Sequence, residues 1–325
     1  MNSFATYLKR FFDEYLPIQR NLSDKTIKSY KYTFKLFLKF IVNNKNISIN
    51  EIDFNILNKD IVRNFLSHLE EKGKSINTRN QRLHAIKSFY QFVGIEDPAN
   101  LINSQQILSI RTKKFTKPLM DYLTIEETKN LIDCVNVSAN KGKRNLVLLN
   151  LLYDSAARVE EITEVRVMDF DLSNKPTLKI FGKGRKYRTI PIMTKTCDII
   201  KQYIDENNLA RTSYLFSNAK NEKLTIRTIE YIVKKYVTLS NCIKNITPHS
   251  IRRSRATHML EAGVNLVYIQ HFLGHESIKT TEIYLQVSQE VKRQAIEKAY
   301  PKTFDNVKTT SWNNDENLLK ELLSL

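Results

Sequence analysis

The sequence predicts a mainly α-helical protein of two domains, with a small β-sheet in the second. Apolar residues recur at the three-to-four spacing of amphipathic helices through the N-terminal third and again from Ile226 onward. Two β-rich stretches, Thr177–Phe181 and Tyr187–Ile192, flank a glycine-containing turn at 182–185, a pattern typical of a hairpin. The chain has 325 residues, 42% of them hydrophobic and 26% charged, which is enough for two globular cores.

Residues 1–102 are expected to form a bundle of four amphipathic helices. The second helix follows Ser23, a favourable N-cap. The third is expected over Asn58–Lys72, and the fourth over Asn77–Phe92 with its end at Gly94. The apolar side chains expected to fill the core of this bundle include Tyr7, Leu8, Phe11, Phe12, Ile27, Phe34, Phe37, Ile61, Phe65, Leu69, Leu83, Ile86, Phe89 and Tyr90.

The net charge of +17 and the pI near 9.6 indicate a polyanionic partner. Nucleic acid is the expected one, because each Lys or Arg close to a phosphate gains Coulomb energy and releases counterions. A ribosome-associated or membrane-surface protein is the alternative interpretation. Residues 1–120 hold 20 basic against 10 acidic residues, so the smaller domain carries most of the excess charge.

Basic faces on the second and fourth helices, and a basic hairpin tip, predict a DNA-contacting surface; a merely solvated face is the alternative. The residues expected to contact DNA are Lys25, Lys28, Arg79, Arg82, Lys87, Arg185, Lys186 and Arg188. Residues 103–120 lack clear periodicity and predict a basic linker that would lie along a phosphate backbone.

The cysteines and the hydropathy pattern predict a cytoplasmic protein, associated with the nucleoid if it binds DNA. Cys134, Cys197 and Cys242 are scattered and form no CxxC pair, which argues against a disulfide framework or a zinc site. No apolar run reaches the length needed to span a membrane.

A second domain is expected over residues 121–300, followed by a tail at 301–325. The domain begins with a capping box, Thr124 with Glu127 three residues later. The tail ends in a short apolar helix that must bury its leucines against its own domain or a neighbouring protomer. These leucines are Leu318, Leu319, Leu322, Leu323 and Leu325.

Four residues near the C-terminal end of the second domain predict a phosphate site with a nucleophile beside it. Thr247 and a following proline mark a helix start, which places His249 and Arg252 one turn apart where a phosphate oxygen is favoured. A later helix ends at a glycine, so His275 projects from a loop, and a helix capped by Ser277 then carries Tyr284. Ordinary surface or core residues are the alternative for each one taken alone.

Two upstream residues are candidates to complete the site. Arg158 follows three small residues, and Glu161 at i+3 is expected to orient its guanidinium. Lys183 lies between two glycines at the hairpin tip, where a lysine can deliver a proton to a leaving oxygen. An exposed Arg–Glu pair and a polar turn are the alternative interpretations.

Six strings occur in the order of the motifs of the tyrosine recombinase (phage integrase) family, which the chain therefore resembles over nearly its whole length. They are LLYDSAARVEE at 151–161, FGKGRKYRTIP at 181–191, TPHSIR at 247–252, ATH at 256–258, LGH at 273–275 and IY at 283–284. The front half is similar to the family's helical, SAM-like core-binding domain. Arg253 and Arg255 depart from the usual pattern, which puts local packing or DNA contact in doubt but none of the six catalytic positions.

The resemblance implies that Arg158, Lys183, His249, Arg252, His275 and Tyr284 are catalytic, with Tyr284 as the nucleophile. It implies strand cleavage and rejoining through a 3′-phosphotyrosyl intermediate and a Holliday junction, for integration, excision or resolution of DNA. Neither a metal nor another cofactor is expected. A type IB topoisomerase-like relaxing enzyme and a non-catalytic DNA-binding regulator are the alternatives.

The resemblance also predicts the partners. The expected DNA is double-stranded with inverted-repeat half-sites. A homodimer would occupy each site and a homotetramer would form in synapsis, with a hetero-tetramer as the alternative. The chain begins almost at once with the core-binding helices, so an Xer-like or transposon-encoded type without an arm-binding domain is expected.

Overall fold

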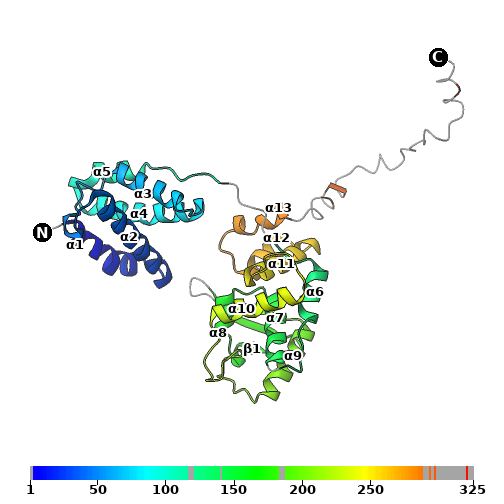
Figure 1. Ribbon diagram of the computed structural model, residues 1–325. Helices are drawn as coiled ribbons and strands as arrows, with labels where there is room; N and C mark the ends of the chain where they lie inside the picture. The colour runs from blue at the N-terminus through cyan, green and yellow to red at the C-terminus, as the bar shows by residue number, and fades with distance from the viewer. Residues whose placement is uncertain are drawn as a thin grey trace. The chain divides into compact units, whose positions relative to one another are not determined.

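The computed structural model describes residues 3–115, 121–139, 141–182 and 187–287, together with residues 293, 296, 297 and 320. The chain divides into two compact units, Met1–Pro118 and Leu119–Leu325, each with its own core. Helices predominate in both units, as the sequence predicts (Figure 1). None of the helices in the described ranges has the length and apolar character needed to cross a bilayer.

The described part of unit 1 contains helices and no strand, and the four expected helices are present. Ser23, Asn58 and Ser75 cap three of them with side-chain hydrogen bonds. Its elements are α1 (Ser3–Arg10), η1 (Phe11–Gln19), α2 (Asp24–Lys45), η2 (Ile49–Glu51), α3 (Lys59–Glu71), α4 (Ile76–Glu96), η3 (Pro98–Asn100) and α5 (Leu101–Leu108).

Two boundaries in unit 1 differ from the sequence prediction. Helix α4 continues through Gly94 to Glu96, because Gly94 does not adopt the left-handed conformation of a helix-ending glycine. A Cβ at Gly94 would lie 3.1 Å from Cβ of Ser104, so this glycine instead allows α5 to pack closely on α4. Helix α5 occupies the start of the expected linker, and its Ile107 is fully buried. The polar residues of this helix interrupt its apolar positions, so the sequence pattern did not predict it.

Aromatic rings form the centre of unit 1. Phe11, Phe34 and Phe89 are at most 2% exposed, and their ring centroids lie 5.2 to 6.3 Å apart. Phe37 and Phe65 extend the cluster between α2 and α3 with centroids 5.0 Å apart. Edge-on aromatic pairs of this kind stabilise a core beyond the area that they bury.

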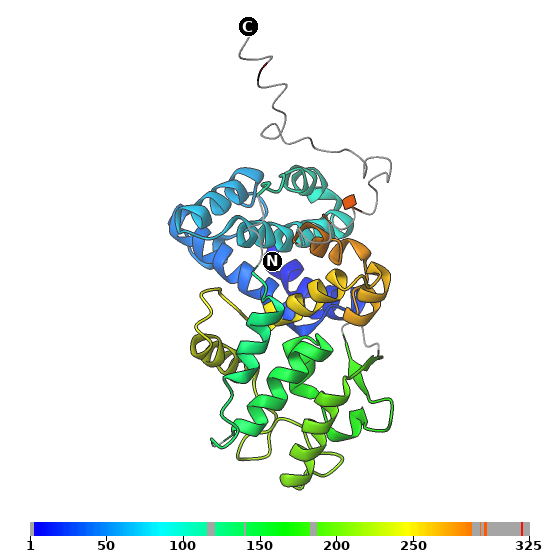
Figure 2. The same cartoon turned by 90° about the vertical axis from the view of Figure 1, so that its right-hand side faces the viewer.

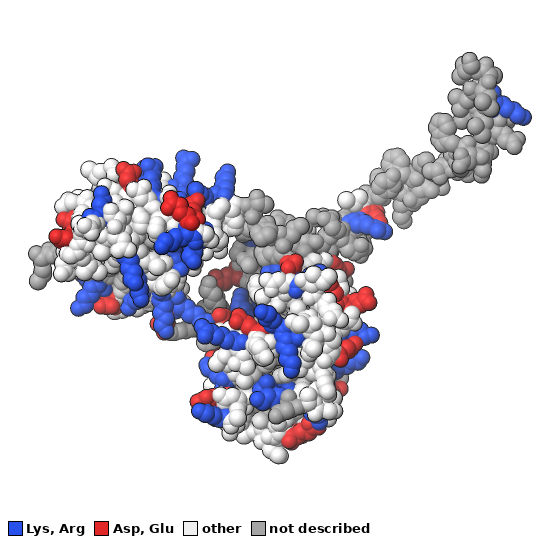
Figure 3. All heavy atoms as spheres, in the orientation of Figure 1, with Lys and Arg blue, Asp and Glu red and all other residues white. Residues whose placement is uncertain are grey.

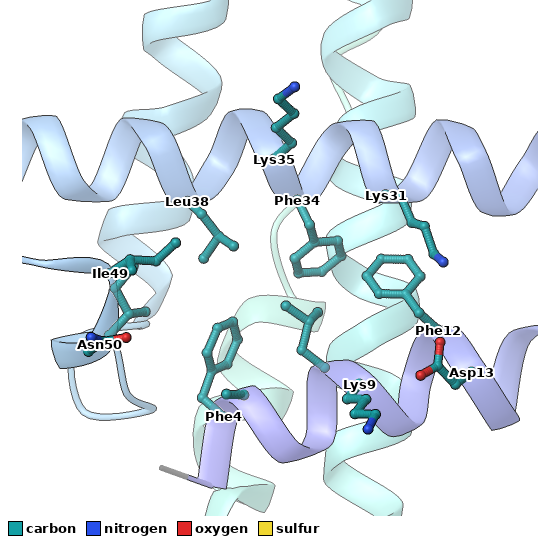
Figure 4. Close-up of a pocket in the computed structure, with 13 residues that line it drawn as sticks. Phe4, Lys9, Phe12, Asp13, Lys31, Phe34, Lys35, Leu38, Ile49 and Asn50 are labelled. Carbon is teal, nitrogen blue, oxygen red and sulfur yellow. The ribbon is translucent and has the colours of Figure 1, made fainter.

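One side of this cluster is open. A hollow of about 650 Å³ lies between α1, η1, α2 and η2, and Phe4, Phe12 and Leu38 point into it (Figure 4). Lys31 lies at its rim, with Nζ 5.6 Å from the centroid of the Phe12 ring. The hollow is therefore apolar inside and basic at its edge.

The expectation that Arg79 forms part of an exposed basic face is wrong. Arg79 is only 6% exposed, and its Nε lies 3.2 Å from Oε1 of Glu70. Its Nη1 also donates to Oδ1 of Asn80 at 3.1 Å. Helical spacing placed this residue on the polar side of α4, but the segment after α5 covers that side, since Nη1 also reaches the Arg111 carbonyl at 3.5 Å.

The other basic residues expected to contact DNA from unit 1 fall into two groups. Lys25 and Lys28 are exposed on α2, and Figure 3 shows that lysine and arginine outnumber acidic side chains on the visible face of this unit. Arg82 and Lys87 are half-buried on α4 and donate to protein acceptors, Arg82 to Thr33 at 3.0 Å and Lys87 to the Leu108 carbonyl at 2.6 Å. DNA contact by these four residues stays a prediction.

Unit 2 is helical around a small antiparallel sheet. The hairpin expected from the sequence is present: Thr177 pairs with Pro191 and Phe181 with Tyr187, and a short third strand joins the other edge. Its elements are α6 (Ile125–Asp133), α7 (Gly142–Ser155), α8 (Val159–Glu164), η4 (Val167–Asp169), β1 (Phe170–Asp171), β2 (Thr177–Phe181), β3 (Tyr187–Pro191), α9 (Thr194–Glu206), α10 (Ile226–Leu239), α11 (Pro248–Glu261), α12 (Leu266–Leu273), η5 (Ile278–Thr280) and α13 (Ile283–Val287).

The core of unit 2 has two parts. The larger packs the inward side of the sheet, including Leu178 and Ile190, against helices such as α7. The smaller joins Ala156, Leu273 and Tyr284, and α12 and α13 both contact α11 (Figure 1, Figure 2). The predicted nucleophile therefore belongs to a packed cluster.

The segment between His275 and Tyr284 differs from the single capped helix that the sequence predicts. It is split into η5 and α13, and the side chain of Ser277 makes no capping hydrogen bond. Thr281 lies between the two pieces, fully buried, and donates to or accepts from the His275 ring. The apolar tail expected at 318–325 lies outside the described residues, apart from Lys320.

Arg79→Ala is expected to lower the free energy of unfolding of the full chain by about 2 kcal/mol, because it leaves the half-buried Glu70 and the buried Asn80 without their charged donor. Urea denaturation measures this. Arg63→Ala is the matched control: Arg63 is 57% exposed in its ion pair with Asp60, so a change within about 0.5 kcal/mol is expected. Unchanged stability with weakened DNA binding in Arg79→Ala would restore Arg79 as a DNA contact.

Candidate active site

Arg158 is placed by a sharp change of direction between α7 and α8. Helix α7 ends at Ala156, which adopts a left-handed conformation with φ of 46°, and Arg158 is the N-cap residue of α8. The backbone N–H of Arg158 donates to Oε2 of Glu161 at 2.8 Å, and its Nη1 donates to Oε1 at 3.0 Å. The contact that the i, i+3 spacing predicts is therefore present.

Arg252 is the most deeply buried charged side chain of the site. It lies on α11 and is 1% exposed. Its Nη1 donates to the Ala156 carbonyl at 2.6 Å and its Nη2 to the Leu273 carbonyl at 2.7 Å. Burial, followed by the nearby charge of Arg158, lowers its pKa to about 10. The guanidinium thus joins the ends of α7 and α12 to α11.

The hydrogen bonds of Arg252 leave donors unused. A guanidinium carries five N–H donors, and Nε of Arg252 has no partner among the described residues. A buried N–H without an acceptor costs free energy, so such a group is expected to meet an acceptor in the working state of the protein. An anion with several oxygens, such as a phosphate, supplies what this guanidinium lacks.

The two histidines lie beside these arginines. His275 follows Gly274, which ends α12 in the expected left-handed conformation with φ of 64°. Burial and then the charges of Arg252 and Arg158 lower the pKa of His275 to about 4, and its Nδ1 lies 2.9 Å from Oγ1 of Thr281. Because its ring is shielded from solvent and both neighbouring guanidinium groups are cationic, His275 is neutral at pH 7.

His249 is the second residue of α11, one turn before Arg252, and follows the Thr247 cap and the proline that the sequence predicts. The residue is exposed as a whole. Loss of solvent around its ring and the charges of Arg253 and Arg252 lower its pKa. A neutral imidazole at this position can accept a proton.

Tyr284 is 2% exposed on α13, with its ring nearly parallel to that of His275 and the two centroids 6.5 Å apart. Burial raises the pKa of its hydroxyl, whereas the charges of Arg252, Arg253 and Arg158 lower it. The net direction is upward, so the hydroxyl is protonated at neutral pH and must lose its proton to become a nucleophile.

Five of the six predicted catalytic residues come together in unit 2. The charges of Arg158 and Arg252 both act on His275 and on Tyr284, and Arg158 donates from Nη2 to the Gly274 carbonyl at 3.4 Å. The sixth, Lys183, lies outside the described residues, as do the expected DNA contacts Arg185 and Lys186.

Two further arginines belong to the neighbourhood. Arg188 was expected to contact DNA, which stays a prediction. Its side chain is 14% exposed, and its Nη2 lies 2.7 Å from Oε2 of Glu161, the carboxylate that also pairs with Arg158. Arg253 is 7% exposed and donates to the Asp121 carbonyl at 2.8 Å. Its departure from the family pattern was visible in the sequence, but its effect on His249 and Tyr284 was not.

These residues define a class of site: a cluster of arginines with neutral histidines and a tyrosine hydroxyl beside it. Glu161 is the carboxylate paired with two of its arginines, so positive charge is in excess. Such a site is suited to hold a phosphodiester while a tyrosine attacks it.

Comparison with known proteins places this site in a family. The model described as "Phage integrase family" matches residues 121–290, and the model described as "Phage integrase, N-terminal SAM-like domain" matches residues 8–96. The chain belongs to the phage integrase family. The predicted combination of a SAM-like helical domain and a catalytic domain is confirmed.

Named relatives cover nearly the whole chain. The putative integrase/recombinase y4rC of Sinorhizobium fredii is 32% identical over 330 residues, which span 99% of this chain and 98% of that protein. The tyrosine recombinase XerD of Staphylococcus epidermidis is 32% identical over 308 residues, spanning 91% and 100%. The tyrosine recombinase XerC of Oceanobacillus iheyensis is 30% identical over 313 residues, spanning 94% and 99%.

Solved structures share the fold. The XerH site-specific recombinase bound to palindromic difH substrate, a post-cleavage complex, has a TM-score of 0.70 at 21% identity, covering 86% of this chain and 81% of that one. The Tn1549 transposon integrase in complex with circular intermediate DNA has a TM-score of 0.68 at 16% identity, covering 91% and 99%.

The low pKa of His275 predicts a pH dependence of stability. An imidazole in the unfolded chain has a pKa of about 6.5, so the unfolded state binds a proton that the folded state, with a pKa of about 4, excludes. The stability due to neutral His275 is complete above about pH 6.5 and is lost as the pH falls towards about 4.

Urea denaturation of the DNA-free protein at pH 7.5 and pH 5.0 measures this effect. The wild type is expected to lose more stability between the two values than His275→Gln, which has no proton to bind at this position. Equal losses would contradict the assignment of His275 as a group held neutral by its surroundings.

Proposed function

We propose that this chain is a tyrosine-type site-specific DNA recombinase that cleaves and rejoins DNA for integration, excision or resolution. The observation that carries the proposal is Arg252, a buried guanidinium with an unused Nε donor. Its two Nη atoms donate to the carbonyls of Ala156 and Leu273, which belong to the same apolar cluster as Tyr284. The tyrosine recombinases XerD and XerC among the relatives support the same activity.

In this proposal Arg158 and Arg252 hold the two non-bridging oxygens of the scissile phosphate. Both are already fixed by hydrogen bonds to Glu161 and to backbone carbonyls, so little reorganisation is needed when charge develops in the transition state. His275 donates a further hydrogen bond. Binding of the phosphate anion raises the pKa of both histidines, which burial and the arginines hold below the ordinary value.

The covalent step exchanges one ester for another. Oη of Tyr284 forms a bond to phosphorus and the bond from phosphorus to the 5′ oxygen breaks. The phenolic proton passes to His249, and Lys183 supplies a proton to the 5′ oxygen. The phosphotyrosyl ester conserves the energy of the broken bond, so a 5′-hydroxyl from a partner strand can reverse the step. Repetition on the other strands passes through a Holliday junction.

The proposed assembly is a homodimer on each inverted-repeat site and a homotetramer in synapsis, within the cytoplasm and on the nucleoid. The XerH structure contains a palindromic difH substrate, and a lambda integrase dimer is bound to a COC′ core site. Both support two subunits on a site with half-site symmetry. The exposed Lys25 and Lys28 are proposed to contact the DNA backbone.

Tyr284→Phe is expected to abolish covalent attachment to a suicide substrate nicked near the scissile phosphate, because phenylalanine has no oxygen to attack phosphorus. Denaturing gel electrophoresis of labelled DNA measures attachment. Tyr231→Phe is the matched control, since Tyr231 is 70% exposed on α10, and it should attach like the wild type. Attachment by Tyr284→Phe would refute the assignment of the nucleophile.

Removal of residues 316–325 is expected to weaken synapsis while leaving the binding of one subunit to a half-site intact. The five leucines of this segment need an apolar surface, and a neighbouring protomer is the proposed one. Gel-shift assays with one half-site and with two full sites separate the two effects. Unchanged synapsis would show that the tail is not part of the assembly.

A further inference from the structure

Arg188 makes a two-point contact with Glu161. Its Nη1 donates to Oε1 at 2.9 Å and its Nη2 to Oε2 at 2.7 Å. The Arg188 side chain is 14% exposed and that of Glu161 is 6% exposed. Paired hydrogen bonds between a planar guanidinium and a carboxylate fix the angle as well as the distance of the two groups. Arg188 therefore ties strand β3 to helix α8.

The same carboxylate also holds Arg158. It accepts the backbone N–H of Arg158 at 2.8 Å and Nη1 at 3.0 Å, so Glu161 receives four hydrogen bonds from two arginines. Burial raises the pKa of Glu161, but the hydrogen bond and charge of Arg188, together with Arg158, outweigh it, and the net pKa is lowered. A buried carboxylate that lost Arg188 would be drawn wholly to Arg158 and would pull its guanidinium out of position.

Arg188 also supports the turn that carries His275. Gly274 has φ of 64°, and a Cβ built on it would lie 3.1 Å from Cδ of Arg188 and 3.3 Å from Nε. The aliphatic stem of Arg188 thus packs directly against this glycine. The Gly274 carbonyl in turn accepts Nη2 of Arg158 at 3.4 Å. Arg188 on β3 therefore contacts both Glu161, which binds Arg158, and Gly274, which precedes His275.

We propose that Arg188 is a positioning residue for DNA cleavage, which holds Glu161 and the Gly274 turn so that Arg158 and His275 face one phosphate. The inference rests on the recombinase activity proposed above and deepens it. Both Nη atoms of Arg188 are engaged by Glu161, and its Nε, which has no partner among the described residues, lies against Gly274, so Arg188 acts through Arg158 and the Gly274 turn. Lysine cannot replace it, since an ammonium does not grip both carboxylate oxygens in one plane.

Single-turnover cleavage of the nicked suicide substrate tests the proposal. Arg188→Gln is expected to form the covalent complex about 100-fold more slowly than the wild type, the effect of a displacement of about 1 Å in a catalytic group. Arg188→Lys, which keeps the charge, is also expected to cleave well below the wild-type rate. DNA affinity in gel shifts should be unchanged for both, and circular dichroism confirms that each variant is folded.

Arg211→Gln is the matched control. It removes the same charge from an exposed position in the loop after α9, so its cleavage rate should equal that of the wild type. Glu161→Gln should slow cleavage as Arg188→Gln does. The double variant should be no slower than the slower single one, because both changes remove the same contact.

Two modified substrates separate positioning of Arg158 from other effects. A methylphosphonate at the scissile position carries no negative charge, so its cleavage depends less on a well-placed Arg158. On this substrate, the ratio of the wild-type cleavage rate to the Arg188→Gln rate should fall at least about tenfold. A sulfur in place of the 5′ leaving oxygen makes protonation of the leaving group unnecessary and should leave the ratio unchanged. General damage to the fold would leave the ratio high on both.

Each outcome decides the question. Cleavage by Arg188→Gln at the wild-type rate would overturn the proposal. So would a ratio of wild-type to Arg188→Gln rates that falls on the sulfur substrate and not on the methylphosphonate. Reduced DNA affinity at an unchanged cleavage rate would make Arg188 a DNA contact, as the sequence predicted. Failure of the wild type itself to attach to DNA would refute the proposed activity, which is a separate result.

Discussion

The burial of Arg252 is the constraint on which the rest of the site depends. A charge at 1% exposure costs several kcal/mol unless it is paired, and here two backbone carbonyls, at the ends of α7 and α12, supply part of the compensation. Because those carbonyls belong to Ala156 and Leu273, the same hydrogen bonds fix the positions of Arg158 and His275, which lie two residues beyond. The packing of Tyr284 against these ends completes the arrangement.

The electrostatic character of the site follows from that burial. Several arginines are brought near one another, and Glu161 neutralises only part of their charge. Burial and the charges of this cluster lower the pKa of His275 to about 4, so this histidine stays neutral at pH 7. The site without DNA is therefore preorganised for an anion, at the expense of local stability. In the proposed complex, the bound phosphate would relieve the repulsion and raise the pKa of the histidines towards the ordinary value.

Local signals in the sequence were reliable where a single residue decides the backbone. The cap at Thr247, the left-handed Gly274 and the alternation of the hairpin all appear as predicted. Prediction failed where packing between elements decides. Gly94 was taken for a helix end but serves close packing on α5, and the stretch before Tyr284 is broken around the buried Thr281. No residue pattern within one helix reveals which neighbour covers it.

The sequence by itself determined the chemistry: the order of arginine, histidine and tyrosine motifs, the helix starts and stops that aim them, and the excess of positive charge. Only the tertiary structure decided which of the described cations are exposed and which are paired within the protein. The sequence predicted both Arg79 and Arg188 as surface residues, yet each forms an ion pair with a glutamate and is largely buried. A charged side chain takes whichever partner satisfies it when solvent is excluded, and that partner is set by contacts distant in sequence.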